Sequence, residues 1–178
     1  MVRSSAALFI ACSLTCLGCD RAALASPPDA ATASGTVLTA TANALAGRWS
    51  CRGAIHGPDG APSPSEVSLD VALDLDQTWL RTEFVTVSGA YPYAFTSYRT
   101  FHPAPKQWVN VIVDNLGGHT VSSSADGATW MGESTGPMGG MKIKDDETLA
   151  PSGELAMRGQ YSLDGESWRT GYDLVCRK

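Results

Sequence analysis

The histidines and cysteines of the chain show no metal-binding pattern. His56, His102 and His119 are widely separated, and no pair has the H-x₃₋₅-H spacing of a zinc site. They fall in different predicted strands or loop edges, where we expect them on the surface. The sequence therefore predicts no metal site.

Nucleophilic catalysis has no recognisable motif either. Ser122, Ser123 and Ser124 lie close to His119 in the sequence, but no Gly-x-Ser-x-Gly elbow is present. Acidic residues 145–147 (Asp-Asp-Glu) are expected at the charged end of a hairpin. We predict no catalytic residue and no cofactor, and an enzyme, such as a cavity-based isomerase or cyclase, stays an alternative.

The first residues are typical of an export signal. A positive start at Arg3 precedes an apolar segment, residues 6–18, that is too short to cross a membrane. Leu17-Gly18-Cys19 resembles a bacterial lipoprotein box, in which Cys19 is lipidated and becomes the mature N-terminus. We expect a signal peptide at 1–18 and a lipoprotein of the cell envelope, facing the periplasm or the outside. The alternative is cleavage after Ala23-Leu24-Ala25, which would release a soluble periplasmic or secreted protein beginning at Ser26.

Residues 19–44 are expected to form a flexible tether. Small and polar residues dominate this segment, which contains almost no large apolar side chain. Its last part, residues 37–45, could instead form a short helix over one opening of the following domain.

The length and composition of the chain predict one small domain. We place this domain at residues 45–178 and expect it to be monomeric. The chain has 178 residues, of which 43% are hydrophobic and 17% charged, and its net charge is −5. This length suits a single core. The acidic balance argues against binding to nucleic acid, which requires a basic face.

From residue 45 onward the hydrophobic period is two. Val67, Leu69, Val71, Leu73 and Leu75 alternate with small or acidic residues, as in a strand with one buried face. Comparable segments follow and precede it, separated by turn sequences such as Asp-Gly. We predict ten strands, at 48–56, 67–76, 78–88, 93–102, 108–114, 119–124, 129–133, 141–148, 154–162 and 167–176. Short connections favour an all-β, antiparallel up-and-down barrel, and a two-sheet sandwich is the alternative.

Several short motifs resemble a family of uncharacterised bacterial lipocalin-like domains. Leu45-Ala46-Gly47-Arg48-Trp49 is similar to the Gly-x-Trp opening of lipocalin-like barrels. Trp79-Leu80, the segment 124–132 and the segment 162–168 also match that family. The resemblance implies a barrel around a cavity but no particular reaction. Related haem-binding barrels carry a late histidine, and this chain has none after His119.

The apolar face of the predicted strands would line a lipophilic cavity, unless these side chains fill the interior completely. Arg99 shares a strand face with Phe95 and Phe101, so burying that face brings a guanidinium inside. It would then need a carboxylate, from the protein or from the acidic head of a fatty-acid-like ligand, unless Arg99 lies outside. The residues predicted to contact a small lipophilic ligand are Leu69, Val71, Leu73, Leu80, Phe84, Arg99, Val111, Met157, Tyr161 and Tyr172.

Cys51 and Cys176 are predicted to form a disulfide. They lie in the first and last strands with the parity of the buried aromatic residues, and these strands are neighbours in a closed barrel. Export to an oxidising compartment favours the same bond. The function that we expect is a lipid-anchored barrel that binds a small lipophilic molecule. The alternatives are a small enzyme and an envelope protein that acts through its outer surface.

Overall fold

The computed structural model describes residues 29–137 and 139–178. The predicted signal peptide, 1–18, and Cys19 lie outside these residues. Within the described residues, one helix precedes ten strands. The elements are α1 (Asp29–Leu45), β1 (Gly47–His56), β2 (Pro62–Asp74), β3 (Trp79–Ser88), β4 (Ala94–His102), β5 (Gln107–Asp114), β6 (His119–Ser124), β7 (Thr129–Gly136), β8 (Gly139–Leu149), β9 (Leu155–Ser162) and β10 (Arg169–Arg177).

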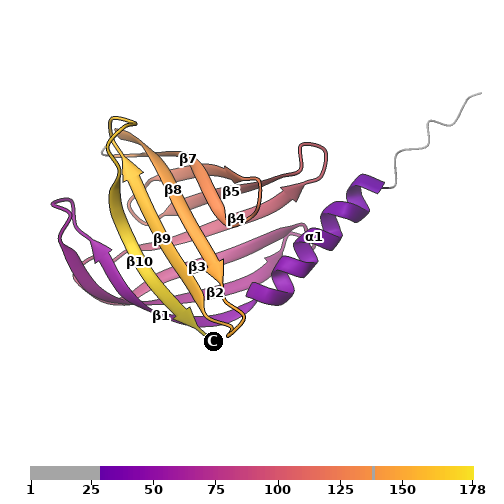
Figure 1. The fold of residues 1–178 in the computed structure, drawn as a ribbon, viewed down its shortest axis with the longest axis horizontal. Helices are drawn as coiled ribbons and strands as arrows, with labels where there is room; N and C mark the ends of the chain where they lie inside the picture. Colours follow the sequence, from indigo (N-terminus) through magenta and orange to yellow (C-terminus); the bar gives the residue numbers. More distant parts are fainter. Residues whose placement is uncertain (1–28, 138) are drawn as a thin grey trace, which may run out of the picture.

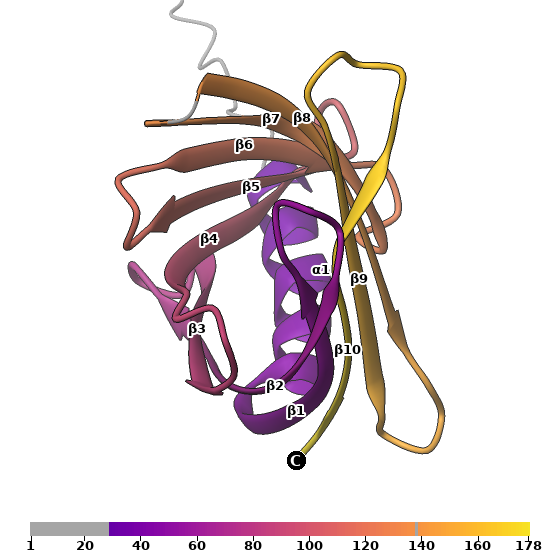
Figure 2. The ribbon, with the colours of Figure 1, turned by 90° about the vertical axis from the view of Figure 1, so that its left-hand side faces the viewer.

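The ten strands form a closed antiparallel barrel in sequence order, with β1 also paired to β10 (Figures 1 and 2). The predicted up-and-down barrel is confirmed. The alternation on β2 decides its faces as expected, because Val67, Leu69 and Val71 are buried whereas Asp70 lies on the outer face. Closure leaves no strand edge unpaired, which removes the main aggregation hazard of an antiparallel sheet.

Two hairpins of the barrel use the same turn. In each, an aspartate two residues after a buried serine accepts its hydroxyl hydrogen and two backbone N–H groups, at Ser124/Asp126 and at Ser162/Asp164. The serine oxygen in turn accepts the N–H of the following glycine, Gly127 or Gly165, which has a positive φ. These bonds lower the pKa of Asp126 to about 2. The Asp-Gly pairs therefore fix the turns through the side chain as well as through glycine's conformational freedom.

The segment predicted as a flexible tether is instead helical from Asp29 onward. The optional short helix at 37–45 is the C-terminal half of α1, which is 17 residues long. Leu38 and Ala42, four residues apart, are both 2% exposed against the barrel. Burial of this narrow stripe, together with the high helix propensity of alanine, explains why a segment poor in large apolar residues folds. Among the described residues, no helix is both long and apolar enough to cross a membrane.

Helix α1 lies across one end of the barrel, where β1 begins and β10 ends (Figure 1). Trp49 donates its indole N–H to the carbonyl of Leu45, and Ser34 donates its hydroxyl to the carbonyl of Phe101. The hydrophobic core extends from beneath the helix into the barrel. This core consists of Leu38, Ala42, Trp49, Cys51, Val67, Leu69, Val71, Leu80, Phe84, Trp108, Trp130, Leu155, Met157, Leu174 and Cys176.

The predicted disulfide is confirmed. Cys51 on β1 is directly opposite Cys176 on β10, with their Cα atoms 3.8 Å apart and their sulfur atoms bonded. Both residues are fully buried. The bond joins the two strands that close the barrel and links positions 125 residues apart.

Replacing both cysteines by alanine should lower the free energy of unfolding by about 3–5 kcal/mol, because the bond shortens the unfolded chain across a very long loop. Guanidinium denaturation followed by tryptophan fluorescence measures the difference. Reduced wild-type protein is the control and should resemble the double variant. An unchanged denaturation midpoint, or two titratable thiols in unreduced, denatured wild-type protein, would contradict the assignment.

Candidate functional site

A cavity of about 310 Å³ occupies the barrel at the end opposite α1. Its volume falls at the lower end of the range for small-molecule sites, about 300–1,000 Å³. The wall is mostly aromatic and aliphatic, with a few hydroxyls and two carboxyl groups. The lining residues are Ile55, Phe84, Tyr93, Phe95, Ile112, Asp114, Leu116, Thr120, Ser134, Met141, Ile143, Asp145, Gly159, Gln160, Tyr161, Gly171 and Tyr172.

Three aromatic rings form one wall of the cavity. Phe84 and Phe95 stack with their ring centroids 4.6 Å apart, and Tyr93 packs against both. The hydroxyl of Tyr93 donates to Asp114. Burial, reinforced by Asp114, raises the pKa of Tyr93 above its ordinary value, so the phenol remains a neutral donor.

A buried ion pair lies inside the barrel, close enough to Asp145 of the cavity lining to affect its pKa. Arg99 on β4 donates from both terminal nitrogens to the two carboxylate oxygens of Glu147 on β8, at 2.8 and 3.0 Å. The guanidinium also lies over the ring of Trp130, 4.9 Å from its centroid. Burial opposes the charge of Arg99, but Glu147 keeps the pKa of Arg99 above its ordinary value. The arginine therefore remains cationic and is already occupied by a protein carboxylate.

Asp145 is the carboxyl group that borders both the ion pair and the cavity. Its Oδ1 accepts a hydrogen bond of 3.0 Å from the hydroxyl of Tyr172 on β10. Burial raises the pKa of Asp145 to about 7, and the negative charge of Glu147 adds to the effect, while Tyr172 and Arg99 oppose it. The side chain therefore changes charge near neutral pH.

Gly159 allows Tyr172 to reach Asp145. A Cβ atom at position 159 would overlap the ring of Tyr172, which lies across the glycine backbone. Gly159 is directly opposite both Asp145 and Tyr172 in the strand register. The absence of a side chain at this position is therefore a geometric requirement of the hydrogen bond.

Three buried polar side chains next to the cavity have no hydrogen-bond partner within the described part of the chain. They are Ser97, Asn110 through its Oδ1, and Ser122. Each is the inward-facing residue next to one of the cavity lining on its own strand, Phe95 on β4, Ile112 on β5 and Thr120 on β6. Such groups are rare in folded proteins and suggest a site for a polar molecule or group.

The predicted ligand contacts divide into distinct groups. Phe84, Tyr161 and Tyr172 line the cavity. Arg99 is inside the barrel, as one hypothesis required, but the carboxylate it needs comes from Glu147 rather than from the lining of the cavity. Five further predicted contact residues point inward but belong to the hydrophobic core or pack against it. They are Leu69, Val71, Leu73, Leu80 and Met157.

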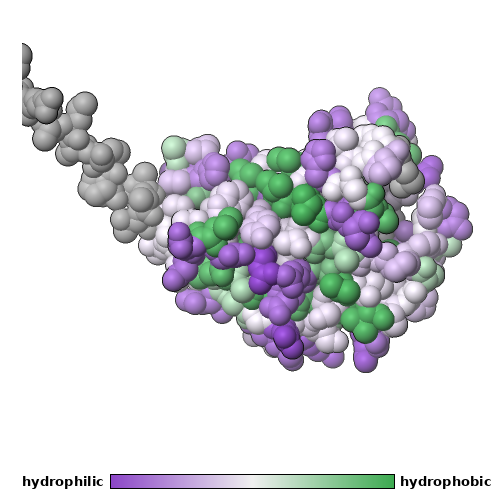
Figure 3. All heavy atoms as spheres, turned by 180° about the vertical axis from the view of Figure 1, so that it is seen from behind, coloured by the Kyte–Doolittle hydropathy of each residue, from purple (hydrophilic) through white to green (hydrophobic). Residues whose placement is uncertain are grey.

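The prediction for Val111 is wrong, because the parity of β5 is the opposite of the predicted one. Trp108 and Asn110 are buried, so the alternate residues of the strand face outward. Val113 is 54% exposed and Val121, opposite Val111 on β6, is 51% exposed. Apolar patches of this kind are visible on the outer surface (Figure 3). The inner face of β5 instead carries Trp108, which packs against Phe101 in the core, and Ile112, which lines the cavity.

The prediction that residues 145–147 form the charged end of a hairpin is wrong, because they lie within β8. Asp145 and Glu147 share the inward parity of Ile143, and only Asp146 of the acidic triplet faces outward, where it pairs with Lys144. The alternating positions of β8 could be assigned from the sequence, with Asp145 and Glu147 on the face of Ile143. Three consecutive acidic residues nevertheless favoured an exposed hairpin end, because charged side chains are rarely buried.

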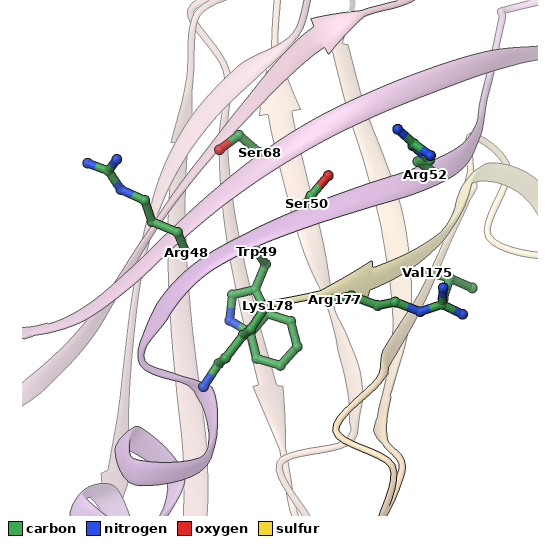
Figure 4. A pocket seen from close by; sticks show the side chains of 8 residues that line it. All are labelled: Arg48, Trp49, Ser50, Arg52, Ser68, Val175, Arg177 and Lys178. Carbon is green, nitrogen blue, oxygen red and sulfur yellow. The ribbon is translucent and has the colours of Figure 1, made fainter.

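A second hollow, of about 650 Å³, lies on the outer surface where β1, β2 and β10 meet (Figure 4). It is basic, but Arg48, Arg52 and Arg177 pair with Asp70, Glu66 and Glu154 respectively. Lys178 lies over the ring of Trp49. Exposed pairs of this type contribute little energy and already satisfy the cations. The barrel cavity is therefore the better candidate site.

Asp145→Asn should change how stability depends on pH. The raised pKa means that the native protein favours the protonated carboxyl, so the contribution of Asp145 is fully present below about pH 4. It is lost as pH rises through about 7, whereas asparagine has no such loss. Between these limits the variant should gain on the wild type by on the order of 1 kcal/mol per pH unit. Urea denaturation from pH 4 to 8 measures this, and parallel curves would contradict the prediction.

Within residues 29–137 and 139–178, no group of three or more His, Cys, Asp and Glu side chains is arranged to hold a metal ion. The chain matches no protein-family model, and no significant relative emerges from comparison with curated proteins.

Proposed function

We propose that the chain is an exported, lipid-anchored protein that binds a small lipophilic molecule inside its barrel. The observation that carries this proposal is the cavity itself, which has a mostly apolar and aromatic wall. Burial of apolar ligand surface against such a wall supplies the binding free energy, while hydroxyls and carboxyls orient the ligand. The lipocalin-like motifs around Trp49 and Trp130 agree with this function.

Two features support the location. The N-terminal pattern ending in Cys19 is typical of a lipoprotein, which would hold the barrel at a membrane of the cell envelope. The Cys51–Cys176 disulfide is of the kind that persists in oxidising compartments outside the cytoplasm. Helix α1 would then lie between the anchor and the barrel.

A second candidate, a cavity-based isomerase or cyclase, is favoured by Asp145. A carboxyl group whose pKa is about 7, in contact with a cavity, is suited to accept and return a proton. Conversion of a bound compound by wild-type protein, lost in Asp145→Asn, would favour this enzyme. Recovery of unchanged compounds by native mass spectrometry of the protein purified from its own host would favour the binding protein.

Filling the cavity should weaken ligand binding. The cavity has room for about ten non-hydrogen atoms, at roughly 30 Å³ for each water-sized volume. Octan-1-ol, n-octylamine and octanoate therefore form a suitable panel for isothermal titration calorimetry. Ile112→Trp, which fills the cavity, should weaken the binding of whichever probes bind wild type by at least about tenfold.

Val111→Trp is the matched control, because it introduces the same side chain on the outer face of the same strand and should leave binding unchanged. Failure of all three probes to bind wild-type protein, or equal binding by the Ile112→Trp variant, would contradict a ligand-binding cavity.

Replacing Cys19 by alanine should move the protein from the membrane fraction to the soluble fraction, because it removes the site of lipid attachment. Cys16→Ala is the control and should leave the protein anchored. Mass spectrometry of the mature N-terminal peptide should show a lipid-modified Cys19. A wild-type protein that is soluble without detergent and begins at Ser26 would contradict the anchor.

A further inference from the structure

The charges around the cavity indicate which lipophilic molecules it would accept. Its described lining contains the carboxyl groups of Asp114 and Asp145 but no lysine, arginine or histidine. The nearby cation, Arg99, directs both terminal nitrogens to Glu147. An acidic ligand would therefore bring a further negative charge beside two carboxyl groups, without a free cation to receive it.

The two carboxyl groups of the cavity are not equally available. Asp114 is committed to its own loop, since Oδ1 accepts the N–H groups of Leu116 and Gly118 and Oδ2 accepts the hydroxyl of Tyr93. Asp145 accepts one hydrogen bond, from Tyr172 to Oδ1, and no bond within the described residues reaches its Oδ2. Asp145 thus presents an unused acceptor at the cavity.

The surroundings of Asp145 are also suited to a cation. Tyr161 and Tyr172 line the cavity with the stacked pair of Phe84 and Phe95, and aromatic faces attract ammonium groups. Ser97, Asn110 and Ser122 add unpartnered oxygens one inward position beyond the lining, where the Nε atoms of Arg99 and Trp130 are unpartnered donors. A primary ammonium has three N–H donors and no acceptor, so the free Oδ2 of Asp145 and these oxygens can accept from it.

We propose that the preferred ligand is a lipophilic amine whose ammonium group pairs with the carboxylate of Asp145. This inference rests on the proposed binding function and names its ligand class. The apolar part of the amine would occupy the wall formed by Ile112, Ile143 and the aromatic residues. Asp145 would act as the residue that discriminates amines from alcohols and acids of the same length.

The charge state of Asp145 makes this preference dependent on pH. Burial raises its pKa to about 7 in a site where Arg99, Glu147, Tyr172 and Tyr93 face it from β4, β8, β10 and the segment before β4. A bound ammonium group would favour the ionised carboxyl. Alkylamines remain protonated to about pH 10, like lysine, so amine binding should strengthen from pH 5 to pH 8. Binding of an alcohol should not change.

Calorimetric titration of the full-length protein at pH 8 with the three C8 probes, below their micelle-forming concentrations, tests the proposal. We expect n-octylamine to bind at least about tenfold more tightly than octan-1-ol, with octanoate weakest. Asp145→Asn should reduce amine affinity to that of the alcohol, without affecting the alcohol. Asparagine can still accept the hydrogen bond from Tyr172, so the variant retains the local structure.

Asp146→Asn is the matched control, because it removes the same charge from the neighbouring position, on the outer face of β8. It should leave the amine preference intact. Equal binding of amine and alcohol by wild type, tightest binding of octanoate, or an equal loss in both variants would overturn the amine proposal while leaving a ligand-binding cavity. Absence of binding by all three probes would instead overturn the proposed function.

Discussion

Closure of the barrel by β1 and β10 is the constraint on which the rest of the structure depends. Every other strand pair joins neighbours in the sequence, whereas this one joins segments at the two ends of the domain. The disulfide between Cys51 and Cys176 links the same two strands covalently. Once the ring is closed, each strand has a fixed inner face, and the alternation of the sequence decides what occupies the interior.

The interior is divided along the barrel axis into regions of different polarity. The end under α1 is packed with apolar side chains, the middle contains Arg99 with Glu147 and Asp145, and the other end is the cavity. A buried ion pair is costly to desolvate and is rarely a net source of stability. Here the bidentate geometry and the Trp130 ring oppose that cost, and both charges of the pair act on Asp145, which lines the cavity.

The sequence alone predicted the barrel well because its information is periodic and local. Regular alternation, as at Val67 to Leu75, and Asp-Gly turns specify strands and hairpins without reference to distant residues. The parity of the two cysteines, combined with closure, was sufficient for the disulfide. The length of α1 was underestimated, because its support comes from burial of Leu38 and Ala42 against strands far along the chain.

The candidate site was harder to predict, since its chemistry depends on pairs across the barrel. Glu147 and Arg99 are 48 positions apart, and no local pattern identifies them as partners. On β5 the rule that the more apolar face is the inner face failed, since Trp108 and Asn110 are buried and the valines lie on the other face. Gly159 carries no chemical signal at all, and its role appears only when the ring of Tyr172 lies across it.

Because α1 and the core close one end of the barrel, a molecule in the cavity has the opposite end as its route in and out. The part that enters first must travel deepest and depart last. A headgroup that meets Asp145 therefore passes through the mouth ahead of its apolar tail, and must shed its water before the tail is sheltered. The slow step of uptake would then be dehydration of the ligand headgroup, whereas release would begin with exposure of the apolar tail to water. A cavity with a single opening thus imposes an order of events on exchange: the head enters first, and the tail of a bound molecule lies nearest the opening.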